Sequence, residues 1–435
     1  MTITPSPQHQ AQQLLDFIDA SPSPWHAVAS AEALLKQHQF EPLFENQTWQ
    51  LRQGGRYYVK RDGASIIAFI SGKPSSIAES GFKIVGAHTD SPGLRLKPKA
   101  AYSSQGYSQL GVEVYGGPIL ATFADRDLSL AGRVNLRNDK GFVSHLIHLQ
   151  ESMVRLPNLA IHMNREVNDK GLTLNKQTGL PLIFGFAADS TEAHAQLTQA
   201  LATPLNVNPQ DILTWDLNVY DTQKGSFWGA NQEFIANSQL DNLASCHAAL
   251  TALFTSEAPT STCLCALFDH EEVGSESATG AGGSFLNDII QRICATSQMH
   301  AEDRLRALAN SFFISADMAH ACHPNHTSAY EPNHHVLPNH GPVIKTNASQ
   351  RYSTNADTAA RFIQLCEQAG VPYQQYAHRT DLGCGSTIGP ILAAQLGIAS
   401  VDVGNAMWAM HSIRESAGVL DHGYLIAVLK QHFQS

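Results

Sequence analysis

The sequence predicts an α/β fold in which helices flank a mixed central sheet, with a β-rich domain inserted into the chain. Three observations favour this fold class. Apolar runs of strand length alternate with segments of helical periodicity. Between residues 97 and 234 the pattern changes to short alternating strands with tight turns. The chain is also too long, at 435 residues, for one ordinary hydrophobic core.

We therefore expect two domains. The main domain is discontinuous and comprises residues 1–96 and 235–435, and the inserted β-rich domain comprises residues 97–234. A hydrophobic content of 43% and a charged content of 15% are typical of a compact α/β enzyme rather than a disordered chain.

Composition excludes several classes of protein. The formal charge of −10 argues against a nucleic-acid partner or an anionic membrane surface. No apolar run reaches the roughly 18 residues that a membrane span requires. The first 13 residues lack the basic and apolar regions of a signal peptide. The seven cysteines are scattered without a Cys-x-x-Cys pair, so we expect a reducing compartment, the cytoplasm.

The N-terminal region supplies helices and a hairpin. Residues 6–39 have helical periodicity that is interrupted by Ser-Pro-Ser-Pro. Two apolar runs, at 57–59 and 65–70, flank the pair Asp62-Gly63, which is a strong hairpin signal.

The next strand, residues 82–87, stops at His88-Thr89-Asp90. Ligands of open α/β sheets gather at the carboxyl ends of strands. His88 has the chemistry to bind a metal while Asp90 holds its other ring nitrogen in one tautomer. The same pair also occurs in ordinary loops, so it decides nothing alone.

The inserted region reads as alternating strands. They are expected at residues 111–115, 128–136, 182–186 and 213–220, with a helix at 191–201. After it, Asp241 lies just ahead of an apolar helix at 244–253. Its side chain is placed either to bridge cations or to act as an ordinary helix cap.

A second apolar strand, residues 261–268, ends in Asp269-His270-Glu271-Glu272. Adjacent carboxylates at the mouth of a buried strand repel each other and are costly to desolvate. We interpret one of Glu271 and Glu272 as a metal ligand and the other as the group that moves a proton. The alternative is an acidic surface loop after a core strand.

A third such strand, residues 311–316, ends at Asp317, and most histidines between His320 and His340 are expected to be solvated. Further strands are expected at 341–345, 372–376 and 398–404, with a helix at 355–368. The glycine-rich turn at 379–390 is not a P-loop, because the Gly-Lys-Ser/Thr ending is absent. His411 precedes the last helix.

Imidazoles and carboxylates thus recur after successive strands of one sheet. Nitrogen and oxygen ligands without thiolate suit zinc, manganese or cobalt, and a bridging carboxylate suits a pair of such ions.

The whole set of motifs resembles the aspartyl aminopeptidase family of di-metal peptidases. The matching stretches are Ala87–Pro92, Asp125–Ser129, Leu240–Asn242, Asp269–Ser275, Ser315–His320, Gly341–Lys345, Cys384–Pro390 and Met410–Glu415.

The resemblance implies a role for each matching residue. His88 and Asp317 would bind one metal ion, Glu272 and His411 the other, and Asp241 would bridge them. The two ions would be divalent, with zinc the first choice and cobalt or manganese alternatives. Glu271 would be the general base, with Asp90 behind His88. Three further residues are assigned to substrate binding, namely Lys345, His162 and His320.

The implied activity is removal of N-terminal residues, Asp or Glu above all, from peptides with a free N-terminus. Lys345 would lie near the acidic side chain, and His162 would reach into a neighbouring subunit's active site. The inserted domain would make dimer contacts, and dimers would assemble into a homododecamer. The nearest rival is a di-metal N-acyl amino acid deacylase, which needs no free amine. A non-catalytic assembly protein would require broken ligand positions, and none is broken.

Overall fold

A computed structural model of the chain describes residues 6–256 and 260–435. The chain divides into two compact units. The first comprises residues 1–90, 225–410 and 415–435, and the second comprises residues 91–224 and 411–414. The long segment of the second unit, residues 91–224, begins and ends earlier than the segment 97–234 expected from the pattern of strands, and the unit also includes His411.

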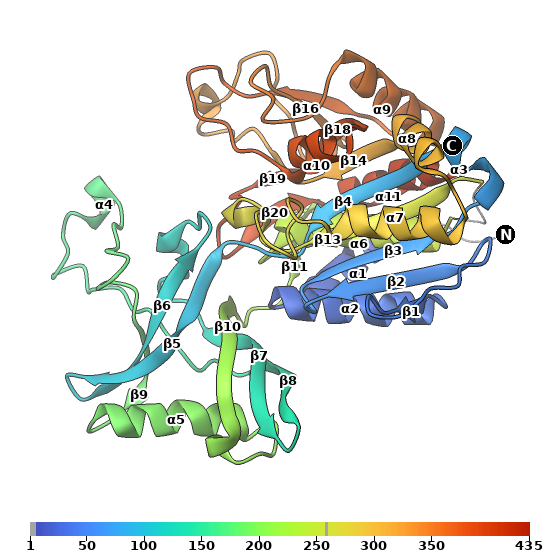
Figure 1. Ribbon diagram of the computed structural model, residues 1–435. Coiled ribbons are helices and arrows are strands. Elements are labelled where there is room, and N and C mark those ends of the chain that lie inside the picture. Colours follow the sequence, from blue (N-terminus) through green and yellow to red (C-terminus); the bar gives the residue numbers. More distant parts are fainter. Residues whose placement is uncertain (1–5, 257–259) are drawn as a thin grey trace. The chain divides into compact units, whose positions relative to one another are not determined.

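The main sheet of the first unit has nine strands among the described residues, and the sheet is mixed (Figure 1). In spatial order they are β1 (Glu41–Leu43), β2 (Arg56–Arg61), β3 (Ser65–Ile70), β13 (Thr262–Phe268), β4 (Phe82–His88), β14 (Phe312–Ala316), β18 (Ala399–Gly404), β16 (Val343–Thr346) and β17 (Gln374–Ala377).

The central strands β13, β4, β14 and β18 run parallel. Their carboxyl ends consequently lie at one edge of the sheet, where open α/β sheets bind ligands. Strands β3 and β16 pair antiparallel on either side of them. The hairpin expected around Asp62-Gly63 is confirmed, since β2 pairs antiparallel with β3.

Helices cover both faces of this sheet, in agreement with the predicted fold class. The helices are α1 (Pro7–Asp19), α2 (Pro24–Gln37), α3 (Ile77–Ser80), α6 (Leu240–Phe254), α7 (Phe285–Thr296), α8 (Ala301–Ala309), α9 (Ala356–Ala369), α10 (Ile388–Leu396) and α11 (Val419–Gln434). Because side chains alternate along a strand, Val85 and Ala87 pack with the α1, α2, α6, α9 and α11 layer. Ile84 and Phe82 pack with α3, α7, α8 and α10 on the other face.

A small second sheet completes the first unit. Its strands in order are β11 (Ser226–Trp228), β12 (Phe234–Asn237), β20 (Glu415–Gly418), β19 (Ala406–Trp408) and β15 (Ala319–His320). It joins segments far apart in the chain, because β12 pairs with β20. Short 3₁₀ turns lie at Pro74–Ser76, Glu271–Val273 and Thr327–Ala329.

The second unit is built on an antiparallel sheet of six strands among the described residues. In spatial order they are β8 (Gly141–His148), β7 (Leu128–Asn138), β10 (Ile212–Asp221), β5 (Gly93–Ser104), β6 (Tyr107–Tyr115) and β9 (Leu182–Phe186). The unit also contains the helices α4 (Val167–Lys170) and α5 (Ser190–Ala202) and 3₁₀ turns at Leu120–Phe123 and Pro209–Asp211. In the described part of the chain, no helix has the length and apolar character that a bilayer span demands.

Candidate metal centre

Four side chains from separate elements of the first unit meet at the carboxyl edge of the central strands. His88 is the last residue of β4, and Asp317 directly follows β14. The His88 Nε2 atom lies 3.4 Å from Asp241 Oδ1 and 3.5 Å from Asp317 Oδ1. One ligand atom from each of His88, Asp241 and Glu272 lies within 4.8 Å of the others. The parallel strands thus bring together the residues that the sequence placed at their ends.

The imidazole of His88 is oriented by the chain that follows it. Its Nδ1–H donates to the Asp90 carbonyl oxygen at 3.1 Å, and the Asp90 Oδ1 atom lies 3.4 Å away. In the neutral imidazole this bond leaves Nε2 as the nitrogen with a lone pair, and Nε2 faces the carboxylates of Asp241 and Asp317.

The carboxylate of Asp90 has a different set of partners. It is fully buried, and its two oxygens accept the backbone N–H groups of Glu271 and Glu272, each at 3.1 Å. Asp90 therefore ties the turn that carries both glutamates to the end of β4. The sequence predicted an orienting role toward His88 but not this connection.

Asp241 lies in the first turn of α6, where the backbone is not helical. The N-cap position is Gln239, whose side chain makes no capping bond, and the backbone departs from helical geometry at Asp241 and Asn242. The Asp241 N–H donates to Glu415 Oε2 at 3.0 Å, and the next residue, Asn242, donates from its side chain to the Ala316 carbonyl at 2.8 Å. These two bonds fix the buried Asp241 carboxylate beside β14.

The charges in this cluster shift two pKa values. Burial raises the pKa of Glu271 to about 8, and the neighbouring carboxylates of Asp317, Asp90 and Asp241 add to the rise while His88 opposes it. Burial lowers the pKa of His88, but contacts with Asp241, Asp317 and Asp90 outweigh it and raise that pKa well above its usual value. Several buried carboxylates around one imidazole form a donor set of oxygen and nitrogen, which fits a divalent cation such as zinc.

Glu271 lies at the side of this cluster. Its Oε2 atom is 4.0 Å from His88 Nε2. Glu272, its neighbour in the same 3₁₀ turn, is the one whose carboxylate belongs to the ligand group. The turn therefore presents two carboxylates in different positions, as the interpretation of one ligand and one proton acceptor requires.

Lys345 is buried against Asp317. Its Nζ atom donates to the carbonyl oxygens of Asp317 and Met318 at 3.0 and 3.1 Å, and it lies 3.4 Å from Asp317 Oδ2. The ammonium also lies 5.1 Å from the centre of the Tyr352 ring. Sequence reasoning missed the bonds to Asp317, because they depend on β16 lying beside β18.

His320 belongs to a cluster of rings that the sequence did not indicate. Its ring centre lies 6.0 Å from that of Tyr376 and 6.2 Å from that of His378, and the Tyr376 hydroxyl is 2.6 Å from His378 Nδ1. Burial, followed by the charge of Lys345, lowers the pKa of His320 to about 4. His320 is therefore not one of the solvated loop histidines, whereas His326 is exposed.

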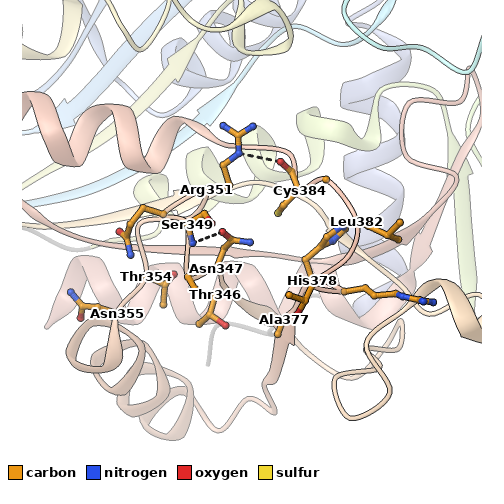
Figure 2. Close-up of a pocket in the computed structure, with 15 residues that line it drawn as sticks. Thr346, Asn347, Ser349, Arg351, Thr354, Asn355, Ala377, His378, Leu382 and Cys384 are labelled. Atoms are coloured by element: carbon orange, nitrogen blue, oxygen red, sulfur yellow. Dashed lines mark hydrogen bonds between the residues drawn. The ribbon is translucent and has the colours of Figure 1, made fainter.

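A cavity of about 700 Å³ lies between the loops that follow β16 and β17 (Figure 2). Polar groups line it, and Arg351 donates from Nε to the Cys384 carbonyl at 3.2 Å across it. The buried Asp402 holds both loops, accepting from the Ser353 N–H at 2.6 Å and from the Thr387 hydroxyl at 2.5 Å. The glycine-rich turn was visible in the sequence, but its pairing with the other loop was not.

Two predicted site residues belong to the second unit. His411 has a left-handed φ of 68°, and its Nδ1 lies 3.1 Å from the Gly117 carbonyl oxygen. His162 is exposed in the loop after Asn158. Neither is part of the group of ligand atoms described in the first unit.

Comparison with known proteins gives one consistent result. The family model described as "Aminopeptidase I zinc metalloprotease (M18)" matches residues 17–433. A protein named probable M18 family aminopeptidase 2, from Ectopseudomonas mendocina, is 47% identical over 426 residues, which cover 98% of each chain.

Two solved structures are similar over nearly the whole chain. A chain in the cryo-EM structure of the Ape4 and Nbr1 complex is 38% identical, with a TM-score of 0.93 and coverage of 98% of this chain and 85% of that one. A chain of the mApe1 dodecamer of S. cerevisiae is 28% identical, with a TM-score of 0.85 and coverage of 98% and 96%.

Proposed function

The chain belongs to the M18 family of aminopeptidase I zinc metalloproteases, and we propose that it removes N-terminal Asp and Glu residues from peptides by a two-metal mechanism. The family establishes a metal-dependent aminopeptidase. The observation that carries the proposal is the gathering of Asp241, Glu272 and Asp317 around the imidazole of His88.

We assign the ligands as follows. His88 and Asp317 would hold one zinc ion, Glu272 and His411 would hold the second, and Asp241 would be shared by both, as the family resemblance implies. The contacts of His88 with Asp241 and Asp317 support the roles of these three residues. The closeness of a Glu272 oxygen to ligand atoms of His88 and Asp241 supports the role of Glu272, and the family resemblance supports that of His411. When bound, a pair of zinc ions supplies Lewis acidity that makes water a nucleophile near neutral pH and stabilises developing negative charge.

Glu271 is the proposed general base. Its carboxylate takes the proton of the attacking water and delivers it to the leaving amine. Support comes from its place beside the ligand group and from Asp90, which fixes the backbone of the turn through the N–H groups of Glu271 and Glu272. A base that is held on a turn with bonded N–H groups keeps its distance to the water constant.

Lys345 is the proposed partner of an acidic substrate side chain. An ammonium has three N–H donors. Two of them are used at 3.0 and 3.1 Å by carbonyl oxygens, while the contact with Asp317 Oδ2 is long, at 3.4 Å. A substrate carboxylate would take the third donor from Asp317 Oδ2, which holds it by the longest of the three bonds, and burial strengthens such a charged bond.

We further propose that the protein forms a homo-oligomer, a dodecamer built from dimers, in which His162 reaches the active site of a neighbouring subunit. The similar chain of S. cerevisiae mApe1 is a dodecamer. Large apolar side chains exposed on either side of His162, at Leu159, Ile161 and Met163, support a contact with another chain.

A panel of aminoacyl anilide substrates tests the proposed activity. The panel should contain Asp, Glu, Leu and Ala, each with a free and with an acetylated amine, and the protein should be metal-free or reloaded with zinc. We expect hydrolysis only of free-amine substrates, only after reloading, and fastest for Asp and Glu. Comparable cleavage of N-acetylated substrates would instead establish a deacylase.

A further inference from the structure

The motif Asp125-Arg126-Asp127 takes no part in the proposed chemistry. It lies in the second unit, between the 3₁₀ turn Leu120–Phe123 and strand β7. Asp125 has a left-handed φ of 59°, a conformation that residues other than glycine adopt rarely and mostly where their surroundings hold them.

Asp125 makes four hydrogen bonds with one short segment, residues 155–158. Its N–H donates to the Leu156 carbonyl at 2.9 Å, and its own carbonyl accepts from Arg155 Nη2 at 2.8 Å. Its carboxylate accepts the Asn158 N–H at 3.0 Å through Oδ1 and the Asn158 side-chain amide at 2.8 Å through Oδ2. The two bonds from Asn158 are the main reason that the pKa of Asp125 is lowered.

The neighbours of Asp125 anchor the same segment. Asp127 Oδ1 accepts from Arg155 Nη1 at 2.7 Å. Arg126 pairs with Asp221 at the end of β10, and its Nη2 donates to Gln223 at 2.6 Å. The motif is therefore fixed to the sheet on one side and to residues 155–158 on the other.

The chain that leaves this anchor exposes large apolar side chains. Residues 159–163, which we call the arm, have Leu159, Ile161 and Met163 exposed at 68%, 49% and 76%. The arm is a compact turn, since the Met163 N–H donates to the Ala160 carbonyl at 2.8 Å. Exposed apolar groups on an ordered turn are typical of a surface that another molecule covers, and ordering it in advance lowers the entropic cost of binding.

We infer that Asp125 is a positioning residue, which fixes the base of the arm so that the arm enters a second copy of this chain. The inference rests on the proposed role of His162, which belongs to the arm. The second copy is the favoured occupant because the arm carries that histidine between apolar side chains and a similar chain assembles with itself. The two bonds from Asn158 to the Asp125 carboxylate are the ones nearest to the arm, so their loss frees the residue from which the arm starts.

The test uses hetero-oligomers in which an intact His162 and an intact Glu271 lie on different copies of the chain. One copy carries His162→Ala with Glu271 intact, and the other carries Glu271→Gln with His162 intact. The two copies bear different affinity tags, are expressed together and are purified over both tags. Peptidase activity above that of each variant alone shows that His162 acts across the interface.

Asp125→Ala is then placed on one copy at a time. On the copy that donates His162, we expect the restored activity to fall on the order of tenfold to a hundredfold, because a misplaced group loses rate steeply. On the copy that carries His162→Ala, the same substitution should leave the restored activity nearly unchanged. Asp216→Ala is the matched control, since it removes the exposed pair with Arg133 in the same unit and leaves the arm intact.

The outcomes separate the proposed role of His162 across the interface from the positioning role of Asp125. No restored activity in the starting pair overturns the cross-subunit role of His162 on which the inference rests. Restored activity that falls equally with Asp125→Ala on either copy overturns the inference, because a general loss of folding or assembly does not depend on which copy is changed. Restored activity that survives Asp125→Ala on the donor copy overturns it as well.

Discussion

Replacement of Asp90 by asparagine should weaken zinc binding without removing a ligand. The Asp90 carboxylate is fully buried, and each of its oxygens accepts one backbone N–H, from Glu271 and from Glu272, at 3.1 Å. Asparagine keeps one oxygen, so its NH₂ group must face one of these N–H donors. A buried donor left without an acceptor costs about 1–3 kcal/mol.

The lost hydrogen bond loosens the turn that carries Glu272, and the substitution also changes the contact of Asp90 with His88. Residues that orient metal ligands typically contribute about 10–100-fold to metal affinity, and tenfold corresponds to about 1.4 kcal/mol. We therefore expect the Kd for zinc of Asp90→Asn to rise about 10–100-fold, measured by competition with a chromogenic chelator. Asp288→Asn, which changes an exposed partner of Arg61 in the same unit, is the matched control. An unchanged Kd for Asp90→Asn, with a native circular dichroism spectrum, would refute the assigned role of Asp90.

Three further predictions concern the base, the substrate and stability. Glu271→Gln should lower kcat about 10²–10⁴-fold and retain zinc, because only the proton acceptor is lost; near wild-type turnover would show that another group is the base. Lys345→Ala should lower kcat/KM for Asp and Glu substrates far more than for Leu and Ala substrates, whereas equal losses would leave Lys345 only its bonds to Asp317. His247 and His422 form a buried pair, with Nδ1 and Nε2 2.8 Å apart, and burial lowers the pKa of His247 to about 4. In the unfolded chain the His247 side chain is protonated below about pH 6.5, whereas in the folded chain it stays neutral until about pH 4. The free energy of unfolding should therefore fall by about 3 kcal/mol between pH 6.5 and 4, relative to the His247→Gln variant. Melting temperatures of the two proteins that change in parallel over this pH range would contradict the prediction.

The residues at strand ends were predictable from the sequence because their positions follow from local rules. An apolar run of strand length that stops at His88, at Glu271-Glu272 or at Asp317 places those groups at the same edge once the strands are parallel. No knowledge of distant pairing is needed for that step. The recurrence of such residues after successive strands therefore located the candidate centre.

What the sequence did not predict depends on pairing between distant segments. The bonds from Lys345 to Asp317 exist because β16 runs antiparallel beside β18. The compact units divide at residue 225 rather than 235, because β12 pairs with β20 near the end of the chain although β11 and β12 alternate like the strands before them. Alternation reports which face of a strand is buried, and it carries no information about the partner strand.

The most direct test of the metal centre is a crystal structure of the zinc-loaded protein with diffraction measured on both sides of the zinc absorption edge. We predict two anomalous peaks roughly 3.5–4 Å apart, as in other two-metal sites, with Asp241 between them, His88 and Asp317 on one ion and Glu272 and His411 on the other. Peaks that lie away from His88, or a single ion with Asp241 and Glu272 uninvolved, would contradict the account.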